Sequence, residues 1–519
     1  MLSTGKINKE KIMLLMKNLF VLSIVMFSLF FGTSAFARDY YVSTAGDDTN
    51  PGTETEPWKS IEKVNATDFE PGDKILFEAC KKFQGTIRLD EKDSGTKDNK
   101  LIVTSYGQGR ATIDGGSGNG IVAASSNLVV KNLNFVGVGR KNGSDGTGVL
   151  LHDCEDVEID NIDVSGFRVG GAQFSGVHNG RMTNVYAHEN GATGISAGAS
   201  EKRWSKNIYI GYCVAENNPG DPCNLTNHSG NGIVVGSLNN AVIEYCEAFN
   251  NGWDMPRRGN GPVGIWAWNA DKVIIQHCIS HDNKSPGHDG GGFDLDGGLT
   301  NCILQYNLSY NNDGPGYFLC QYPTASVFKN NIVRYNISQN DGTRNNRMSG
   351  IDIYAGDVGM SDCQIYNNTI YSTKDAAIAF GGMDVPGIII RNNLFIFAGE
   401  LISGDSQRGR FENNVYWQVD DRDLIFDGHT SIDEWAKATG QEKIGDTVVG
   451  KYIDPKVIKA GLATLTDPKK LADLKAYRLK ADSPCIGAGL PIKDNGGKDF
   501  WGNKIPEKGK PSIGACQVP

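Results

Sequence analysis

The feature that most constrains this chain is a short pattern that recurs at nearly even intervals. Each copy is an apolar strand, then Asn or Cys, then another apolar residue, as in 129–133, 157–162, 303–308 and 332–337. Ten steps cover 414 − 132 = 282 residues, or about 28 per step, which suits a three-strand solenoid coil better than a propeller blade of about 40. The marked residues are Asn132, Asn161, Asn184, Cys213, Cys246, Cys278, Asn307, Asn336, Asn368, Asn393 and Asn414.

This period predicts an all-β fold, a single-stranded parallel β-helix of about 11 coils. Coils about 4.8 Å apart place equivalent residues on top of one another, so the Asn column should form a ladder of buried amides. The three Cys in that column should be buried thiols. A second column, which we expect to occupy left-handed turns, is Asn218, Asn251, Asn283 and Asn312.

The N-terminal residues are typical of a secretory signal peptide spanning 1–37. Positive charge at Lys6, Lys9, Lys11 and Lys17 precedes the apolar run 19–31, and 35–37 is a small-x-small cleavage site. The mature chain should begin at Arg38, be secreted to the periplasm or the exterior, and contain no membrane span. Met1 and Met16 both remain possible starts.

The mature chain divides into three regions by pattern. Residues 38–119 are expected to form an N-terminal cap and the first strands, with a short helix over 58–64. Residues 120–418 carry the β-helix repeats. In 419–519, Ser431 and Glu434 form a capping box that opens a helix through Ala438, and the turn-rich tail should wrap the C-terminal end. Cys485 and Cys516 lie where they could pair, which the sequence leaves open.

Both ends of the mature chain resemble secreted β-helix proteins of the pectate-lyase-like superfamily. The resemblance rests on residues 40–48, 50–53 and 57–58 at the start, and on 483–489 and 513–515 at the end. It covers nearly the whole mature chain and implies a right-handed parallel β-helix that works on a polysaccharide. The superfamily holds lyases, glycoside hydrolases, epimerases and proteins of no known activity, so it does not specify the reaction.

One strand column precedes each repeat and often begins with Gly, as in 264–268, 292–296, 316–320 and 350–354. Side chains alternate faces along a strand, and the second and fourth residues are consistently apolar, so these should face the core. The third and fifth residues must then face outward: Trp266, Trp268, Asp294, Asp296, Phe318, Cys320, Asp352 and Tyr354.

Aromatic rings and carboxylates on neighbouring coils are what a sugar-cleaving site needs. We expect Asp294 and Asp296 to be the main acid and base, with Asp352 or Asp313 as a third. Asp294 and Asp296 lie about 6.5–7 Å apart along one strand, and Asp294 and Asp352 about 9.6 Å apart across two coils. Both separations favour an inverting mechanism. The expected sugar platform is Trp266, Trp268, Tyr354 and Phe318.

Four insertions just before this column, at 217–231, 251–262, 283–291 and 341–349, should project from one side and form the walls of a groove. Their basic residues suggest an acidic or sulfated sugar. The residues expected to bind substrate there are Arg257, Arg258, His288, Arg344 and Arg347, with Lys284 nearby.

Residues 288–298 with 312–314 also resemble the lyase branch of the superfamily, whose Gly-Phe-x-x-Lys strand precedes an Asp-Asp-Gly turn. The position of the Lys, which acts as base in those lyases, is Asp296 here, and this departure argues against lyase chemistry. Lys284 or an Arg from the loops could substitute for it. The resemblance allows a Ca²⁺ site made by Asp289, Asp294, Asp296 and Asp313.

Three functions remain open on these grounds. The first is an inverting glycoside hydrolase, which requires no cofactor. The second is a Ca²⁺-assisted polysaccharide lyase, and the third is a non-catalytic glycan-binding solenoid. In each case the partner is a polysaccharide and the protein is expected to be a monomer. The net charge of −9, with no long block of one sign, argues against a nucleic-acid partner.

Overall fold

The computed structural model describes Met13 and residues 37–344, 348–383 and 387–518. The chain divides into two units, Met1–Arg38 and Asp39–Pro519. Of the expected signal peptide, only Met13 and Ala37 are among the described residues. Among the described residues, no helix has the length and apolar character needed to cross a bilayer.

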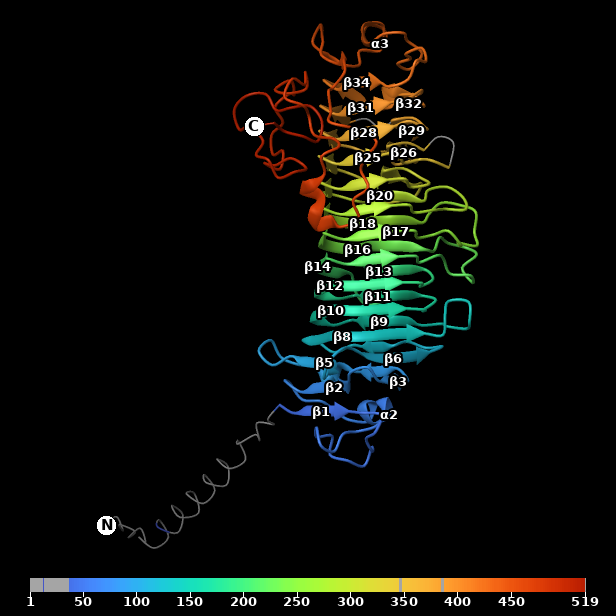
Figure 1. The fold of residues 1–519 in the computed structure, drawn as a ribbon, viewed down its shortest axis with the longest axis vertical. Helices are drawn as coiled ribbons and strands as arrows, with labels where there is room; N and C mark the ends of the chain where they lie inside the picture. The colour runs from blue at the N-terminus through green and yellow to red at the C-terminus, as the bar shows by residue number, and fades with distance from the viewer. Residues whose placement is uncertain (1–12, 14–36, 345–347, 384–386, 519) are drawn as a thin grey trace, which may run out of the picture. The chain divides into compact units, whose positions relative to one another are not determined.

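The described residues between Asp39 and Tyr452 form a right-handed parallel β-helix whose coils stack on one another (Figure 1). Three parallel sheets run along the stack. Sheet 1 consists of β4 (Ile87–Leu89), β7 (Ile121–Ala123), β9 (Thr147–His152), β11 (Gly170–Ser175), β13 (Thr193–Gly198), β16 (Asn231–Glu244), β18 (Val263–Gln276), β20 (Gly291–Leu295), β23 (Tyr317–Gln321), β26 (Ile351–Ala355), β29 (Ile378–Gly382) and β32 (Ile402–Ser403).

Sheet 2 shares the long strands β16 and β18 with sheet 1. Its other strands are β1 (Asp39–Val42), β2 (Lys74–Glu78), β5 (Leu101–Tyr106), β8 (Leu128–Gly137), β10 (Glu155–Ser165), β12 (His178–His188), β14 (Ser205–Gly211), β21 (Ile303–Gln305), β24 (Ile332–Arg334), β27 (Cys363–Tyr366), β30 (Ile388–Arg391) and β33 (Arg410–Glu412).

Sheet 3 shares β8, β10 and β12 with sheet 2. It adds β3 (Lys82–Gln84), β6 (Ala111–Gly116), β15 (Val214–Glu216), β17 (Glu247–Phe249), β19 (Ile279–His281), β22 (Leu308–Tyr310), β25 (Ile337–Gln339), β28 (Thr369–Ser372), β31 (Leu394–Phe397), β34 (Val415–Gln418) and β37 (Lys451–Tyr452).

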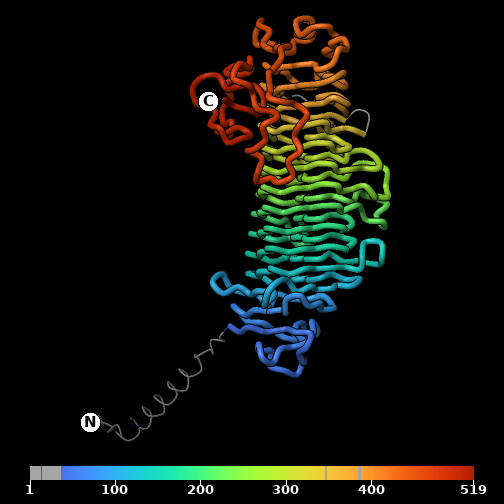
Figure 2. The backbone as a smooth tube through the Cα atoms, viewed as in Figure 1, coloured from blue at the N-terminus to red at the C-terminus, as the bar shows by residue number. Residues whose placement is uncertain are grey.

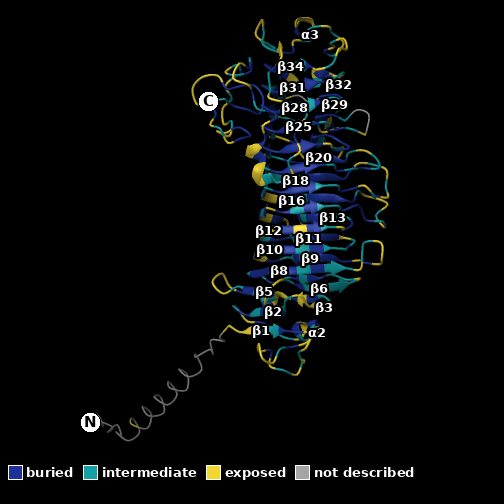
Figure 3. Cartoon of the chain, in the orientation of Figure 1, coloured by how far each residue is buried: buried dark blue, intermediate teal, exposed yellow. Residues whose placement is uncertain are grey.

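The core is a continuous column of apolar side chains enclosed by the three sheets. Figure 3 shows the buried residues following the strands from end to end of the stack. Alternation along each strand explains this, because every second side chain points inward and meets its equivalents one coil above and below. In sheet 1, for example, Ile265, Phe293, Tyr317 and Ile351 are fully buried.

The predicted Asn ladder exists from Asn307 onward. The Asn307 side-chain amide donates to Asn336 Oδ1 at 3.1 Å, and the same bond continues through Asn368 and Asn393 to Asn414. All five side chains are fully buried. Below the ladder, Cys213, Cys246 and Cys278 are buried thiols, as predicted.

The lower part of that predicted column was wrong by one residue. Tyr186 pairs with Val214, so Cys213 stacks on Val185 rather than on Asn184. Asn132, Asn161 and Asn184 instead share a left-handed backbone position with residues such as Tyr212. A one-residue shift in register moves a side chain to the other face of the strand. The sequence pattern did not reveal the shift, because the apolar Val185 directly follows Asn184 and fits the column equally well.

The second Asn column also forms a buried amide ladder. Asn218 donates to Asn251 Oδ1 at 2.9 Å, and the bonds continue through Asn283 and Asn312 to Asp341. The prediction that these ladder residues occupy the left-handed turn positions was wrong. The left-handed residues are those immediately before them: Asn217, Asn250, Asp282, Asn311 and Asn340. The ladder residues serve as amide donors and acceptors in the turn instead.

The ends of the stack are closed by short elements. Helix α2 (Ile61–Asn65) begins three residues later than expected, after its N-cap Ser60. Helix α3 (Ile432–Thr439) has the predicted N-cap Ser431, which accepts a hydrogen bond from the Glu434 amide, and Trp435 buries its ring in the core. Two more strands, β35 (Lys443–Ile444) and β36 (Thr447–Val448), and three 3₁₀ helices complete the elements: η1 (Glu91–Asp93), η2 (Ser406–Arg408) and η3 (Pro468–Asp473).

The C-terminal tail covers a side of the stack rather than wrapping its end. Leu471, Tyr477 and Ile513 pack in one apolar cluster with Leu308 and Ile337 of sheet 3. The reason is that the outward side chains of these strands are apolar and need cover. Cys485 and Cys516, also in the tail, are both free thiols.

Candidate functional site

The outward side chains of sheet 1 form two rows that run along the stack. In the first row, the register aligns Val234, Trp266, Asp294, Phe318 and Asp352 on successive strands. The second row holds Trp268, Cys320 and Tyr354, with Asp296 between the first two. The predicted inward and outward faces are confirmed, since every inward partner belongs to the core cluster.

Loops wall these rows on one side. Figure 2 shows the green to yellow-green loops projecting from one edge of the stack. Neighbouring loops bind each other through the backbone, because Gly252 donates to Asn218, Lys284 to Asn251 and Asp313 to Asn283. Under this cover the outward row is largely buried rather than solvent-facing: Trp266 is 6% exposed and Phe318 7%.

Asp294 of β20 lies at the centre of this site. It is flanked by Trp266 on one neighbouring strand and Phe318 on the other, and is only 4% exposed. Burial, then the carboxylates of Asp296, Asp289 and Asp352, raise its pKa well above the usual range. Its Oδ1 is buried with no hydrogen-bond partner in the described structure, which is rare for a carboxyl oxygen. Such an atom is suited to an incoming ligand group.

Two further carboxyl groups of the rows have raised pKa values. Burial raises the pKa of Asp296 to about 6, although hydrogen bonds from the Gly297 amide and the Cys320 thiol oppose the shift. Burial and the nearby Asp289 carboxylate raise the pKa of Asp352 to about 8. At neutral pH the site therefore contains both ionised and protonated carboxyl groups.

Asp294, Asp296 and Asp352 form a carboxyl cluster, and Asp289 joins it from the loop before β20. Its carboxylate accepts a hydrogen bond from the Gly261 amide, and burial raises its pKa. It acts electrostatically on Asp294, Asp296 and Asp352 alike. The sequence suggested Asp289 only as a metal ligand, whereas the structure makes it a member of the carboxyl cluster.

Two hollows flank the cluster along the stack. The first, of about 390 Å³, lies toward the N-terminal coils and is lined by Ala192, Thr193, Asn227, His228, Asn231, Val234, Asn260, Trp266, Trp268, Asp296 and Tyr322. The second, of about 510 Å³, lies toward the C-terminal coils and is lined by His288, Phe318, Met348, Asp352, Tyr354, Ala379, Phe380, Gly381, Ser403 and Gly404. Each hollow thus combines aromatic rings with one carboxyl group of the cluster.

The first hollow contains a set of residues that the sequence analysis missed. Asn231 Oδ1 accepts the indole N–H of Trp266 at 3.1 Å, and the rings of His228 and Trp266 lie 5.2 Å apart. Burial and the charge of Arg257 lower the pKa of His228 to about 4, so this imidazole is neutral at pH 7. His228 and Asn231 lie on or next to the first insertion, which was the only sequence signal for them.

Asp313, a predicted third catalytic residue, is held apart from the cluster. It accepts a hydrogen bond from the Ser285 amide and pairs with Arg344 at 3.3 Å. It does not contribute to the raised pKa of any cluster member.

Of the predicted basic residues that the structure describes, His288 alone lines one of the two hollows. Arg257 bonds to Asn260 within its own loop, Lys284 bonds to Asn250, and Arg258 is exposed. His288 is exposed and lines the second hollow. Arg347 lies outside the described residues. The lining of the two hollows is therefore aromatic, amide and acidic.

The four carboxylates suggested for Ca²⁺ do not fit that ion as a set. Asp313 is bound by Arg344, a cation that competes with a metal for its oxygens. Within the described ranges, no group of three or more His, Cys, Asp or Glu side chains is arranged to hold a metal ion.

Comparison with solved structures supports the fold. A GH136 lacto-N-biosidase from Eubacterium ramulus shares 20% identity over 68% of this chain and 67% of that one, with a TM-score of 0.53. The A-module of the Azotobacter vinelandii mannuronan C-5 epimerase AlgE6 shares 14% over 70% and 94%, with a TM-score of 0.50. At these identities the likeness concerns the fold alone. The sequence matches no curated protein.

A family model described as the Pel9A-like, right-handed β-helix region matches residues 40–346. This span contains all the coils that carry Asp289, Asp294 and Asp296. Because the match covers more than half of the 519 residues, the chain belongs to the Pel9A-like family of right-handed β-helix proteins.

Proposed function

We propose that this protein is a glycoside hydrolase that cleaves a polysaccharide on the outward rows of sheet 1. The groove that would hold the polysaccharide consists of these rows and the two hollows. The observation that carries the proposal is the unpartnered Oδ1 of Asp294, a buried carboxyl group with a raised pKa, next to Asp296. Pairs of carboxyl groups whose surroundings separate their pKa values are suited to act as acid and base. The aromatic side chains of the two hollows support the binding of sugar rings.

In the proposed reaction Asp294 is the acid and Asp296 the base. Asp294 gives its proton to the glycosidic oxygen as the bond from that oxygen to the anomeric carbon breaks. Asp296, ionised above about pH 6, takes a proton from the water that attacks the same carbon. One water is consumed, and the products are a new reducing end and an alcohol.

The spacing of the pair favours inversion. Residues two apart on a strand have Cα atoms about 6.5–7 Å apart, and inverting enzymes hold their carboxyl groups about 6.5–9.5 Å apart. Such a gap leaves room for the attacking water. Asp352 and Asp289 keep the local potential negative, which favours the protonated form of Asp294.

The lining of the hollows favours an uncharged glycan over the acidic or sulfated sugar suggested by the loop residues. Asp296 and Asp352 face the hollows, whereas Arg344 and Lys284 bind protein groups elsewhere. At neutral pH a uronate in the groove would be repelled by the ionised Asp296 and would find few cations to bind it.

The test is an activity screen of the protein, from Arg38 onward, on plant and algal polysaccharides with and without Ca²⁺ or a chelator. Asp294→Asn and Asp296→Asn are compared with Asp98→Asn, an exposed Asp far along the chain. We expect reducing ends without new ultraviolet absorbance, lost in the first two variants and retained in the third.

Other outcomes of the screen contradict the proposal. An unsaturated product, detected by its ultraviolet absorbance, would favour the lyase alternative. Cleavage that survives both variants would place the chemistry on another face. Binding without cleavage of any substrate would favour the non-catalytic alternative.

A further inference from the structure

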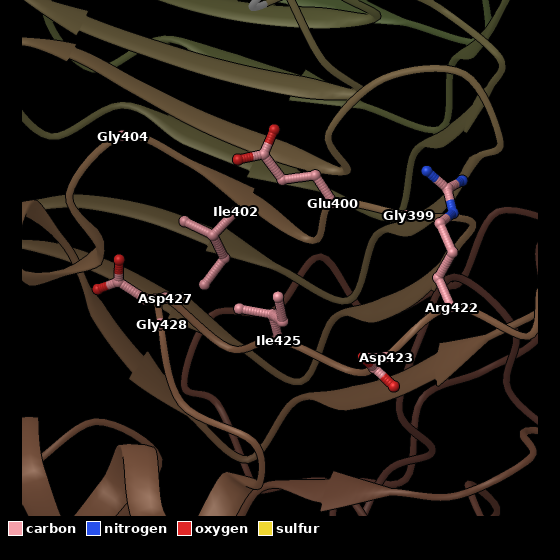
Figure 4. A pocket seen from close by; sticks show the side chains of 9 residues that line it. All are labelled: Gly399, Glu400, Ile402, Gly404, Arg422, Asp423, Ile425, Asp427 and Gly428. Atoms are coloured by element: carbon pink, nitrogen blue, oxygen red, sulfur yellow. The ribbon is translucent and has the colours of Figure 1, made fainter.

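A third hollow continues the groove beyond the second one. It has a volume of about 580 Å³ and is lined by Gly399, Glu400, Ile402, Gly404, Arg422, Asp423, Ile425, Asp427 and Gly428 (Figure 4). Gly404 also lines the second hollow, so the two adjoin. The third hollow uses none of the carboxyl groups assigned to the reaction.

The register of sheet 1 gives the distance of this hollow from the reacting groups. The first row continues from Asp294 through Phe318, Asp352 and Ala379 to Ser403. Four steps of about 4.8 Å place Ser403, whose neighbours Ile402 and Gly404 line the third hollow, about 19 Å from Asp294. A sugar in the third hollow is therefore too far away to react, and belongs to a chain several residues long.

Small residues occupy both outward rows of sheet 1 at the β29 level, near the second and third hollows. Gly381 lies next to Tyr354, and a Cβ atom on Gly381 would come within 3.0 Å of the Tyr354 ring. The first row has only Ala379 at this level. The floor of sheet 1 therefore has small side chains at this level.

The lining has the mixed character that a sugar ring requires. Figure 4 shows Ile402 and Ile425 side by side, with the carboxylates of Glu400 and Asp427 on either side of them. Ile425 is 52% exposed, so it offers an apolar surface to the C–H face of a pyranose. Asp427 is fixed by a 2.5 Å hydrogen bond from the Ser406 hydroxyl and can accept bonds from sugar hydroxyls.

The charge of the third hollow selects against anionic sugars. Three carboxyl groups line it against one cation, Arg422, which is already paired with Asp420. Partial burial, then the nearby Asp375 carboxylate, raise the pKa of Glu400, so a further carboxylate lies within electrostatic reach of this lining. Sugar hydroxyls can donate to these carboxylates, whereas uronate or sulfate groups would be repelled.

We propose that the third hollow is a distal subsite that binds uncharged sugar residues of the same glycan whose reacting bond lies over Asp294. This inference rests on the proposed function, since it takes the groove to be the glycan site. It makes the preferred substrate a polymer or long oligosaccharide rather than a disaccharide.

The test measures binding without cleavage. The Asp294→Asn protein is run through native gels containing galactomannan, xyloglucan, laminarin, polygalacturonate or alginate, alone and with Ile425→Asp or Ile425→Ala added. Ile444→Asp is the matched control, because Ile444 is 43% exposed and lies outside all three hollows. Polymer-dependent retardation is read against a gel without polysaccharide.

We expect retardation by at least one of the three uncharged polymers, an affinity about tenfold lower with Ile425→Asp, a smaller loss with Ile425→Ala, and none with Ile444→Asp. Retardation only by polygalacturonate or alginate, no retardation in any gel, or equal retardation of the Ile425 and Ile444 variants would overturn the inference. Because the readout needs no cleavage, a failure of the hydrolase proposal appears separately, in the product screen.

Discussion

Replacing Asp352 by Asn should stabilise the protein at alkaline pH. The carboxyl group of Asp352 is 8% exposed, and burial followed by the Asp289 carboxylate raises its pKa to about 8, from 3.8 for the unperturbed group. In the unfolded chain this group ionises near pH 3.8. Between pH 3.8 and about 8, the folded chain therefore binds one more proton at this position than the unfolded chain does.

The sign of the effect follows from proton linkage. Where the folded state binds more protons than the unfolded state, the free energy of unfolding decreases as pH rises. The contribution of Asp352 is fully present below pH 3.8 and is lost as pH rises through about 8. A difference of about four pH units, at about 1.4 kcal/mol each, sets an upper limit near 6 kcal/mol, and relaxation of the site should leave about 3 kcal/mol.

Asn is nearly the same size as protonated Asp but cannot ionise. At pH 4 the variant and the wild type should unfold at similar temperatures, whereas at pH 9 the variant should unfold about 3 °C higher, given about 1 kcal/mol per °C for a chain of this length. Thermal unfolding followed by circular dichroism at both pH values, with Asp98→Asn as control, measures this. Equal pH dependence in Asp352→Asn and wild type would refute the argument.

Three further predictions concern the reaction, the sugar platform and the ladder. The rate of cleavage should rise with pH through about 6 as Asp296 ionises, and fall at higher pH as Asp294 loses its proton; a rate that is flat across pH 5–7 would contradict this assignment. Trp268→Ala should weaken substrate binding by about 2 kcal/mol, seen as a roughly thirtyfold rise in KM, and an unchanged KM would remove Trp268 from the platform. Asn336→Ala should lower the free energy of unfolding in urea by about 2–4 kcal/mol, because buried partners such as the Asn307 amide lose their acceptor, whereas exposed Asn99→Ala should cost little.

The coil architecture was predictable because the same apolar alternation recurs in every coil of the sequence. Each coil repeats the alternation that places Ile265, Phe293 and Ile351 inside, so an error in one coil is corrected by its neighbours. The column below Cys213 was misassigned by one residue because that region offers two adjacent columns that both fit the pattern. Register is decided by backbone pairing, which no single coil displays in its sequence.

The groove was only partly predictable, since it is formed by residues far apart in the chain. Alternation along the strand identified Asp294, Asp296 and Asp352. It could not show that Asp313 turns away to Arg344, or that Asp289 turns in toward the cluster, because both belong to loops whose course depends on contacts with neighbouring loops. For the same reason His228 was not identified.

The stability cost of the buried carboxyl groups in the first row supports the proposal that they take part in proton transfer. The same row holds Val234, Phe318 and Ala379 at neighbouring levels, so apolar side chains fit this buried surface without difficulty. Asp294 and Asp352 at such positions cost stability whenever they are ionised, and the Asp352 carboxylate raises the pKa of Asp294 further through repulsion. A surface that only bound neutral sugars could use amides or hydroxyls, which carry no such cost. Proton transfer is the task that requires carboxyl groups with separated pKa values, and it is the one that the arrangement of Asp294 beside Asp296 supports.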